Sequence, residues 1–194
     1  MERSPEGIYE KRLVLDKEFT YVPRSDPASY ERFAREKLLE SLEKKIDGAI
    51  TGSILKPDLR DLKAFDTFIE DHKGIDLLIL AIGVKGHYAQ VMPGTPIEKG
   101  FHVTKLIPEL SAVHSQKGSK SYEGAKFREY GMSLGPKQVL GAKNIIVMIT
   151  GESKIDLVKQ LLSYKSFDPH FPLSIIHHPT VKPKIEVFLS KEVM

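Results

Sequence analysis

Apolar and polar positions alternate along the chain in blocks that predict strands and helices in turn. Apolar runs of strand length are Arg12–Leu15, Ala49–Leu55, Ile75–Ile82, Asn144–Thr150 and Lys184–Leu189. The run from Ile75 to Ile82 is nearly all apolar, which is typical of a central parallel strand covered on both faces.

Apolar residues at helical spacing predict amphipathic helices between these strands. A first helix is expected from Asp26, a favourable N-cap followed by Pro27, to about Lys45. A second is expected to begin at Pro57-Asp58 and to end at Gly74. Their apolar faces would consist of Tyr30, Phe33, Ala34, Leu38 and Leu42 in the first helix and Leu59, Leu62, Phe65 and Ile69 in the second.

Two further helices are expected, from about Pro136 to Leu140 and from Gly151 to about Ser163, the latter with Ile155, Val158, Leu161 and Leu162 directed inward. Strands that alternate with helices predict an α/β fold with right-handed crossovers, in which helices cover both faces of a doubly wound, mostly parallel sheet. A length of 194 residues suits one domain, which is expected to span residues 1–194.

The stretch from Pro93 to Arg128 is rich in Gly, Ser, Lys and Pro and predicts a long connection. Within it, we expect a short strand near His102–Leu106 and a helical turn around Glu109–His114. Connections of this length in a compact domain more often have a function than not.

Composition narrows the classes of function. The net charge of +3 suits a small anionic ligand but is far below what a nucleic-acid-binding face requires. The absence of cysteine excludes disulfides, thiolate zinc sites and a cysteine nucleophile. The first residues lack the apolar core of a signal peptide, and no apolar run has a membrane-spanning length. A soluble, cytoplasmic protein is therefore expected.

His87 and Lys154 are the first candidates for chemistry. A lone histidine is usually a surface or packing residue, but His87 follows a buried strand and two glycines, where α/β proteins gather ligands. Its imidazole could serve as a general acid or base near neutral pH. Lys154 follows Thr150-Gly-Glu-Ser at a helix start, which suits a phosphate, although a solvent-facing lysine is the commoner case.

Other candidates are weaker. His177 and His178 are adjacent, and adjacent residues of an extended segment point to opposite sides, so they seldom bind one metal ion. Asp16 and Glu18 follow the first strand and could lie at the same sheet edge as His87. No ligand cluster for a metal is visible, and no cofactor is expected.

The combination of motifs resembles the glucosamine-6-phosphate deaminase/6-phosphogluconolactonase superfamily. The stretch Gly83-Val-Lys-Gly-His-Tyr-Ala-Gln-Val-Met-Pro-Gly94 resembles its signature, which reads Gly-x-Asp-Gly-His, then Ile-Ala-Phe-Asn-Glu-Pro in deaminases or Thr-Ala-Ser-Leu-Phe-Pro-Gly in lactonases. Thr150-Gly-Glu-Ser-Lys154 resembles the deaminase Thr-Gly-x-x-Lys. Phe171-Pro-Leu-Ser-Ile-Ile-His-His-Pro179 resembles Pro-Ala-Ser-x-Leu-Gln-Leu-His-Pro.

The similarity extends to the N-terminal part. Asp16-Lys-Glu-Phe and Asp26-Pro-Ala-Ser-Tyr30 resemble the deaminase Asp-Glu-Tyr and His-Pro-x-Ser-Tyr. Arg3-Ser-Pro-Glu-Gly-Ile-Tyr9 resembles the phosphate loop Gly-Ser-Thr-Pro-x-x-x-Tyr, so the chain looks like a divergent member with a shortened N-terminus. The resemblance implies a Rossmann-like sheet.

The resemblance also implies roles for individual residues. His87 would open the sugar ring and handle the oxygen proton, and Lys154 would hold the phosphate. Gly83 and Gly86 would preserve the turn of the family signature in which the backbone approaches its neighbours closely, with Lys85 between the two glycines. An early carboxylate, Asp16 or Glu18, would move the proton at carbon 2, and Lys117 lies near the position of a phosphate-binding arginine.

The acidic partners of the family are replaced. Lys85 stands where the signature has Asp, and Met92 stands where deaminases have Glu, although lactonases have an apolar residue there. Lys17 falls at the early catalytic Asp, so Asp16 or Glu18 would serve only with a shift of one residue. Lysine beside His87 should disfavour an imidazolium ion.

Three functions follow from these observations. The first is a sugar-phosphate isomerase/deaminase that converts an amino-sugar phosphate to a ketose phosphate and ammonia. The second is a 6-phosphogluconolactonase-like hydrolase, in which the histidine activates water. The third is a non-catalytic protein that binds a sugar phosphate or acts in an assembly. The expected partner is a small phosphorylated sugar, with no nucleic acid and no membrane. A homo-oligomer remains an alternative to a monomer.

Overall fold

The computed structural model describes residues 7–9, 12–15, 23–25, 29–40, 53–107 and 130–193. The chain divides into two compact units. Unit 1 comprises Met1–Leu62 and Lys105–Met132, and unit 2 comprises Lys63–Thr104 and Ser133–Met194. The expectation of a single domain stays a prediction.

Unit 1 contains short strands. β1 (Gly7–Tyr9) pairs in parallel with β3 (Ser53–Leu55), and β2 (Arg12–Leu15) is the neighbour of β6 (Tyr130–Ser133). The predicted strand at Arg12–Leu15 is confirmed. β3 occupies the end of the predicted strand Ala49–Leu55, whose first four residues lie outside the described part.

The first helix begins later than its sequence predicted. α1 (Tyr30–Ala34) has Ser29 as its N-cap, and the Ser29 hydroxyl accepts a hydrogen bond from the backbone N–H of Arg32. Asp26, the predicted cap, lies outside the described residues together with Pro27. Because Ser29 satisfies one of the first N–H groups of the helix, it performs the function that the sequence assigned to Asp26.

The helix continues as a π-helical segment, η1 (Arg35–Leu39). Hydrogen bonds from residue i to i+5 put more residues in each turn than an α-helix has, so the buried face moves along the sequence. Leu39 is buried, whereas Phe33 and Leu38 of the predicted apolar face are 51% and 42% exposed. The prediction is wrong for both residues. Leu38 lies in the π-helical segment, where regular helical spacing does not hold, whereas Phe33 lies in α1, and nothing in the described structure explains its exposure.

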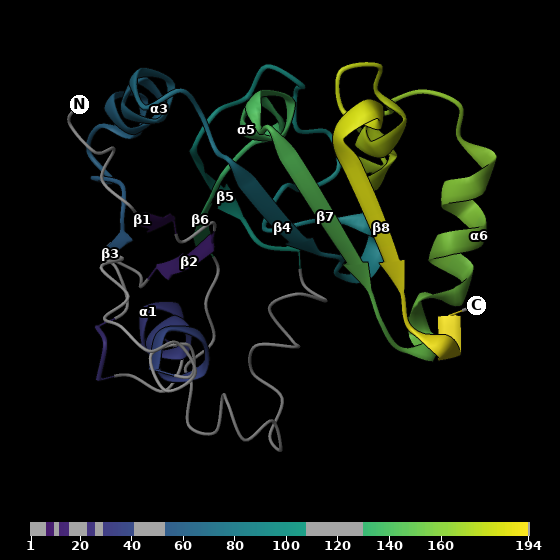
Figure 1. The fold of residues 1–194 in the computed structure, drawn as a ribbon, viewed down its shortest axis with the longest axis horizontal. Helices are drawn as coiled ribbons and strands as arrows, with labels where there is room; N and C mark the ends of the chain where they lie inside the picture. The colour runs from purple at the N-terminus through teal and green to yellow at the C-terminus, as the bar shows by residue number, and fades with distance from the viewer. Residues whose placement is uncertain are drawn as a thin grey trace. The chain divides into compact units, whose positions relative to one another are not determined.

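A parallel sheet forms the centre of unit 2 (Figure 1). Its strands are β4 (Leu77–Ala81), β7 (Asn144–Ile149) and β8 (Ile185–Leu189), in that order. The register pairs Ala81 with Met148 and Met148 with Phe188. All three strands therefore end at the same edge of the sheet. These strands lie close to their predicted positions, and the mostly parallel α/β class is confirmed.

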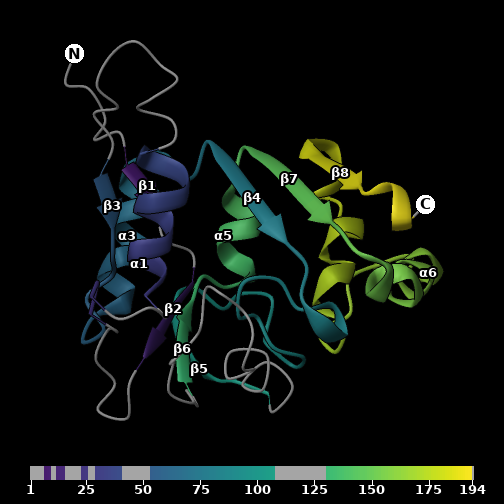
Figure 2. The ribbon, with the colours of Figure 1, turned by 90° about the horizontal axis from the view of Figure 1, so that it is seen from below.

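The two faces of β4 differ in burial. Leu78 and Leu80 are 4% and 1% exposed, whereas Leu77 and Ile79 are 51% and 41% exposed. The prediction that this strand is covered on both faces is therefore wrong. Figure 2 shows α5 (Pro136–Gly141) on one side of the strands. The all-apolar sequence of the run concealed the difference, because alternate residues of a strand face opposite sides.

Helices and short helical turns complete the described structure. α3 (Leu62–Asp71) begins at Leu62 rather than at Asp58, because the Asp58 carboxylate caps a separate turn by accepting from the backbone N–H of Arg60. α3 ends before Gly74, which has φ +81° and donates to the carbonyl of Ile69. α5 confirms the helix predicted from Pro136.

α6 (Ile155–Ser163) confirms the helix that was predicted to end at Ser163. Of its two predicted inward leucines, Leu161 is 4% exposed and Leu162 is 68% exposed, so the prediction for Leu162 is wrong. β5 (His102–Lys105) confirms the short strand of the long connection, whereas the helical turn predicted at residues 109–114 lies outside the described part. Within that part no helix is long and apolar enough to cross a membrane.

A buried polar network joins distant segments of unit 2. The Asp66 carboxylate accepts from the backbone N–H of Phe101 at 3.0 Å and from the Gln138 amide at 2.5 Å. The Gln138 carbonyl oxygen accepts from the N–H of Gly135 at 2.9 Å. At Gly135 a Cβ would lie 2.0 Å from the backbone oxygen of Lys99, so only glycine permits this approach.

We predict that Gly135→Ala lowers the free energy of unfolding by about 2–4 kcal/mol, because the added methyl group meets backbone rather than a movable side chain. Urea denaturation measures the change. Gly141→Ala, at the end of the same helix, is the matched control: its Cβ meets nothing within 4 Å, and we expect it to be neutral or to stabilise by up to about 1 kcal/mol. Equal effects of the two substitutions would contradict the prediction.

Candidate active site at the carboxyl edge of the sheet

The turns that follow β4 and β7 carry His87 and Lys154. Because the two strands are parallel neighbours, with Ala81 paired to Met148, both turns leave the same edge of the sheet. The end of β8 is tied to the second turn. The backbone N–H of Ser190 donates to the carbonyl of Ile149, and the Ser190 hydroxyl accepts from the N–H of Gly151 at 3.2 Å. In open α/β sheets, this edge is where ligands bind.

The imidazole of His87 packs directly on Gly83. A Cβ at position 83 would lie 2.1 Å from Cε1 and Nε2 of the ring, which leaves room only for glycine. The N–H of Gly83 also donates to the carbonyl of His87 at 2.9 Å and closes the turn. His87 is only 2% exposed, so the ring is held in place by its surroundings.

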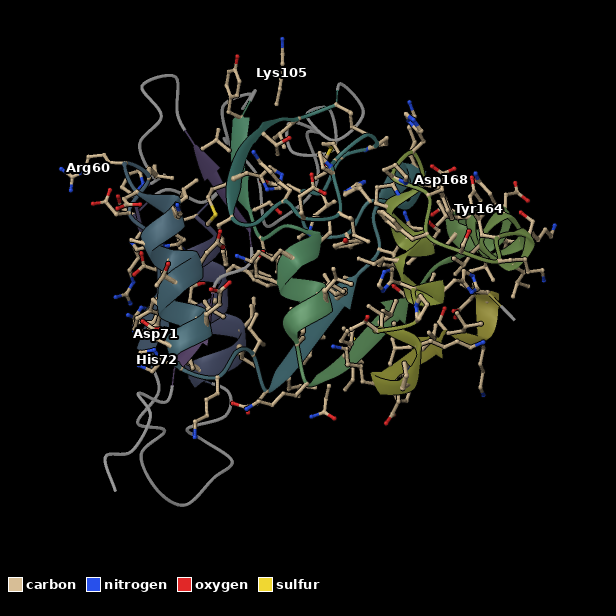
Figure 3. All side chains as sticks on the ribbon, turned by 90° about the horizontal axis from the view of Figure 1, so that it is seen from above. Arg60, Asp71, His72, Lys105, Tyr164 and Asp168 are labelled. Carbon is tan, nitrogen blue, oxygen red and sulfur yellow. The ribbon has the colours of Figure 1, made fainter. Side chains whose placement is uncertain are left out.

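Two residues of this turn have left-handed backbone conformations. Lys85 has φ 56° and ψ 22°, and Gly86 has φ 73°. A Cβ at Gly86 would lie 2.5 Å from the ring of Phe171, whose other neighbour is Tyr164, stacked on it at 4.9 Å between ring centroids. Figure 3 labels Tyr164 in the segment after α6. At Lys85, a long side chain occupies a conformation in which Asn and Asp are enriched.

A second tight turn follows at once. The N–H of Val91 donates to the carbonyl of Tyr88 at 2.9 Å, and Ala89 between them has φ 47°. The N–H of Gln90 donates to the Ser133 hydroxyl at 3.0 Å, and that hydroxyl donates to the carbonyl of Leu134. Burial raises the pKa of the Tyr88 phenol, so its hydroxyl keeps its proton.

The end of this segment is anchored by another part of unit 2. The N–H of Gly94 donates to the carbonyl of Pro169 at 2.8 Å. Asp168, labelled in Figure 3, begins the adjacent turn, where its N–H donates to the Ser174 hydroxyl at 2.7 Å. The motif Phe171–Pro179 therefore supports the histidine turn through Phe171 and through this backbone contact.

Lys154 ends the short helical turn η3 (Glu152–Lys154) that leads into α6. Its side chain is partly buried, and burial lowers the pKa of its ammonium group. No carboxylate of the described ranges pairs with it. A cation without an acidic partner at a helix start suits an anionic group such as phosphate.

The structure describes only part of the predicted site. Gly83, Lys85, Gly86 and His87 share one turn, and Lys154 follows the neighbouring strand. Asp16, Glu18 and Lys117 lie outside the described residues, so their roles stay predictions.

The two adjacent histidines have separate partners. His177 Nε2 lies 3.1 Å from the carbonyl oxygen of Leu161, and His178 Nδ1 accepts from the N–H of Thr180. His177 ends a short helical turn, Pro172–His177, rather than lying in an extended segment, and the expectation that the two histidines do not bind one metal ion stays a prediction. No cluster of three or more His, Asp or Glu side chains suited to a metal ion occurs in residues 53–107, 130–193 or the shorter described segments.

Sequence reasoning missed His102. Its Nδ1 lies 2.9 Å from the carbonyl oxygen of Gly100, which assigns the proton to Nδ1, while the buried Nε2 has no hydrogen-bond partner in the part of the chain that the structure describes. Burial lowers the pKa of His102, and Lys99 adds to this, while the Gly100 carbonyl and Asp66 oppose it. The sequence predicts the strand that contains His102. It contains no signal that Nε2 of this histidine is buried without a hydrogen-bond partner.

The protein can now be placed among known families. The model of the family "Glucosamine-6-phosphate isomerases/6-phosphogluconolactonase" matches residues 18–184. The chain belongs to this family. Its curated relatives include the glucosamine-6-phosphate deaminase of Lysinibacillus sphaericus (strain C3-41), which is 28% identical over 166 residues, or 84% of this chain and 68% of the relative.

Solved structures of both branches share the fold. A monomeric glucosamine-6-phosphate deaminase superposes with a TM-score of 0.75 at 20% identity, over 95% of this chain and 72% of that one. The 6-phosphogluconolactonase from Leishmania guyanensis superposes with a TM-score of 0.57 at 15% identity, with the same coverage of both chains. At these identities the likeness establishes the Rossmann-like fold.

We predict that His102 makes stability depend on pH. Because its pKa is lowered in the folded chain, the unfolded chain binds more protons below the ordinary histidine pKa of about 6.5. The free energy of unfolding should therefore fall as the pH drops through 6.5, by at most about 1.4 kcal/mol per pH unit for this one proton.

Urea denaturation between pH 5 and 8 measures this effect. His102→Asn keeps a donor for the Gly100 carbonyl and should flatten the pH profile, whereas His170→Asn, at an exposed histidine, should leave it as in wild type. The prediction is wrong if His102→Asn has the same slope as wild type.

Proposed function

We propose that the protein acts on a small phosphorylated sugar, as an isomerase/deaminase of the glucosamine-6-phosphate type. The observation that carries the proposal is the placement of His87 and Lys154 on turns that leave one edge of the β4–β7 sheet. This placement supports a site in which His87 moves protons and Lys154 binds the phosphate of the same ligand. The names of the curated relatives support the deaminase reaction.

In this proposal the phosphate binds to Lys154, with Lys117 as a second cation. His87 transfers the proton that the ring oxygen gains when the sugar ring opens. Asp16 or Glu18 moves the proton from carbon 2 to carbon 1, which leaves an imine at carbon 2. Water adds to this imine and ammonia leaves, so that the water oxygen becomes the ketone oxygen of the ketose phosphate. The close packing of the imidazole on Gly83 supports the role of His87, because a fixed ring loses little freedom on reaching the reactive geometry.

A specific observation favours the lactonase as the second candidate. Residues 83–94 contain no carboxylate, and Met92-Pro-Gly94 follows the lactonase form of the signature. The N–H of Gly94 is held by Pro169, so this apolar end of the turn has a defined place. Hydrolysis of a lactone requires an activated water molecule rather than the deaminase glutamate.

The third candidate, a non-catalytic sugar-phosphate-binding or assembly protein, is favoured by Lys85 and Met92 at acidic positions of the family. A cytoplasmic location, an absence of nucleic-acid partners and the choice between monomer and homo-oligomer stay predictions.

A direct test assays the protein side by side for ammonia release from glucosamine 6-phosphate and for hydrolysis of 6-phosphogluconolactone. NMR titration with glucosamine 6-phosphate measures binding in parallel. We expect Lys154→Met to weaken binding at least about tenfold, whereas Lys159→Met, at an exposed lysine of α6, changes nothing. We expect His87→Gln to retain binding and to lose about 10²–10⁴-fold in turnover.

The outcomes separate the candidates. Ammonia release supports the deaminase, and lactone hydrolysis alone supports the second candidate. Binding without turnover of either substrate supports the non-catalytic protein. Absence of binding to glucosamine 6-phosphate and of turnover of either substrate, with Lys154→Met indistinguishable from wild type, contradicts every candidate that binds a sugar phosphate.

We further predict that Lys85→Asp increases turnover. Asp restores the charge that the family has beside the histidine, and its side chain suits the left-handed backbone at position 85. Lys85→Asn is the matched control, because it fits the same backbone without the charge. An equal gain for both variants would attribute the effect to the backbone, and no gain for either would contradict the prediction.

A further inference from the structure

Resting on the proposed function, we propose that Tyr88 and Gln90 form a subsite for the hydroxyl groups of the sugar. Neither residue follows the family pattern: Ile or Thr stands at the first position and Phe or Ser at the second. The family signature therefore assigns no role to these two side chains. The subsite would determine which sugar phosphates the protein accepts.

The side chains of Tyr88 and Gln90 bury polar atoms that form no hydrogen bonds to the described residues. Tyr88 is 0% exposed, and its hydroxyl has no hydrogen-bond partner among the described residues. Gln90 is 1% exposed, and within the same part of the chain both Nε2 and Oε1 of its amide lack a partner. Such groups cost free energy in a folded protein unless something bonds to them, so each requires an explanation.

The backbone that carries these two side chains is fixed by hydrogen bonds. The N–H of Val91 bonds to the Tyr88 carbonyl, and the N–H of Gln90 bonds to the buried Ser133 hydroxyl. Ala89 between them has φ 47°, which is unfavourable for alanine. A strained, well-bonded turn that presents unpaired side chains is more typical of a binding site than of a packing defect.

The unpaired atoms of Gln90 and Tyr88 include both hydrogen-bond donors and acceptors. A glutamine amide offers two N–H donors and an acceptor, and a tyrosine hydroxyl both donates and accepts. A sugar hydroxyl also donates and accepts, so it can satisfy either group. Phosphate offers only acceptors at its charged oxygens, and an apolar group would leave all three atoms unpaired.

Tyr88 and Gln90 belong to the segment that follows the turn of His87, and Lys154 follows the neighbouring strand. In this proposal the hydroxyl groups of the sugar bind to that segment, and the phosphate binds to the lysine.

Gln138 shows what a structural glutamine looks like in the same unit. It is also buried, but its amide donates to Asp66 and accepts from Gly135. The two glutamines have the same chemistry and similar burial and differ in whether protein partners satisfy them. Gln138 is therefore the matched control for Gln90.

The test compares wild type, Gln90→Met, Tyr88→Phe and Gln138→Met. Calorimetry measures the affinities for glucosamine 6-phosphate, glucose 6-phosphate and inorganic phosphate, and thermal denaturation measures the stability of the free protein. We expect Gln90→Met to weaken both sugar phosphates about tenfold and to leave inorganic phosphate unchanged, since only the sugars lose hydrogen bonds. We expect Tyr88→Phe to have the same selective effect, about threefold to tenfold.

Stability provides an independent readout. Gln90→Met removes unpaired polar atoms and should keep or raise the melting temperature of the free protein. Gln138→Met removes the partner of the Gly135 N–H and one of the two hydrogen bonds to the Asp66 carboxylate, so it should lower the melting temperature, while the ratio of sugar-phosphate to phosphate affinity stays as in wild type.

Two results would overturn the subsite, and they are distinguishable. If Gln90→Met and Tyr88→Phe bind the sugar phosphates as wild type does, the unpaired atoms serve internal water or packing alone, and the proposed function stands. If wild type binds no sugar phosphate, the proposed function fails and the subsite fails with it.

Discussion

The parallel register between β4 and β7 is the constraint on which the rest of the site depends. Pairing Ala81 with Met148 sets the carboxyl ends of both strands at one edge. The histidine turn and the lysine turn then leave the sheet as neighbours, although more than sixty residues separate them in the chain. A slip of one residue in this pairing would also exchange the buried and exposed faces, so burial of Leu78 and Leu80 fixes the register and the site together.

Close packing restricts the geometry around His87. The ring lies on Gly83, Phe171 lies against Gly86, and both contacts fail if a Cβ is added. Left-handed conformations at Lys85 and Ala89 have a cost in folding free energy, which well-bonded surroundings must offset. The geometry of the turn therefore does not require an acidic residue at position 85, where this chain has lysine. Shape and charge can change independently because different atoms determine them.

Much of the fold could be predicted from the sequence, because strands and helices follow apolar spacing. β2, β7, β8, α5 and α6 all lie close to their predicted bounds. The errors have physical causes. A π-helical turn moved burial from Leu38 to Leu39, and an all-apolar strand concealed that Leu77 is exposed. Hydrogen-bond satisfaction, which singles out Gln90 and His102, depends on long-range contacts that no local pattern contains.

The buried polar atoms connect stability with function in this protein. Gln138 is satisfied by backbone and carboxylate and so contributes to the folded state, whereas Gln90 carries the cost of an unpaired amide. A chain under selection for stability alone would replace Gln90 with an apolar residue of similar volume. Its presence beside a strained turn and a fixed imidazole is best explained by a ligand that supplies the missing hydrogen bonds. In that case the segment binds a polar ligand even though Lys85 and Met92 stand at positions where acidic residues occur in the family signature.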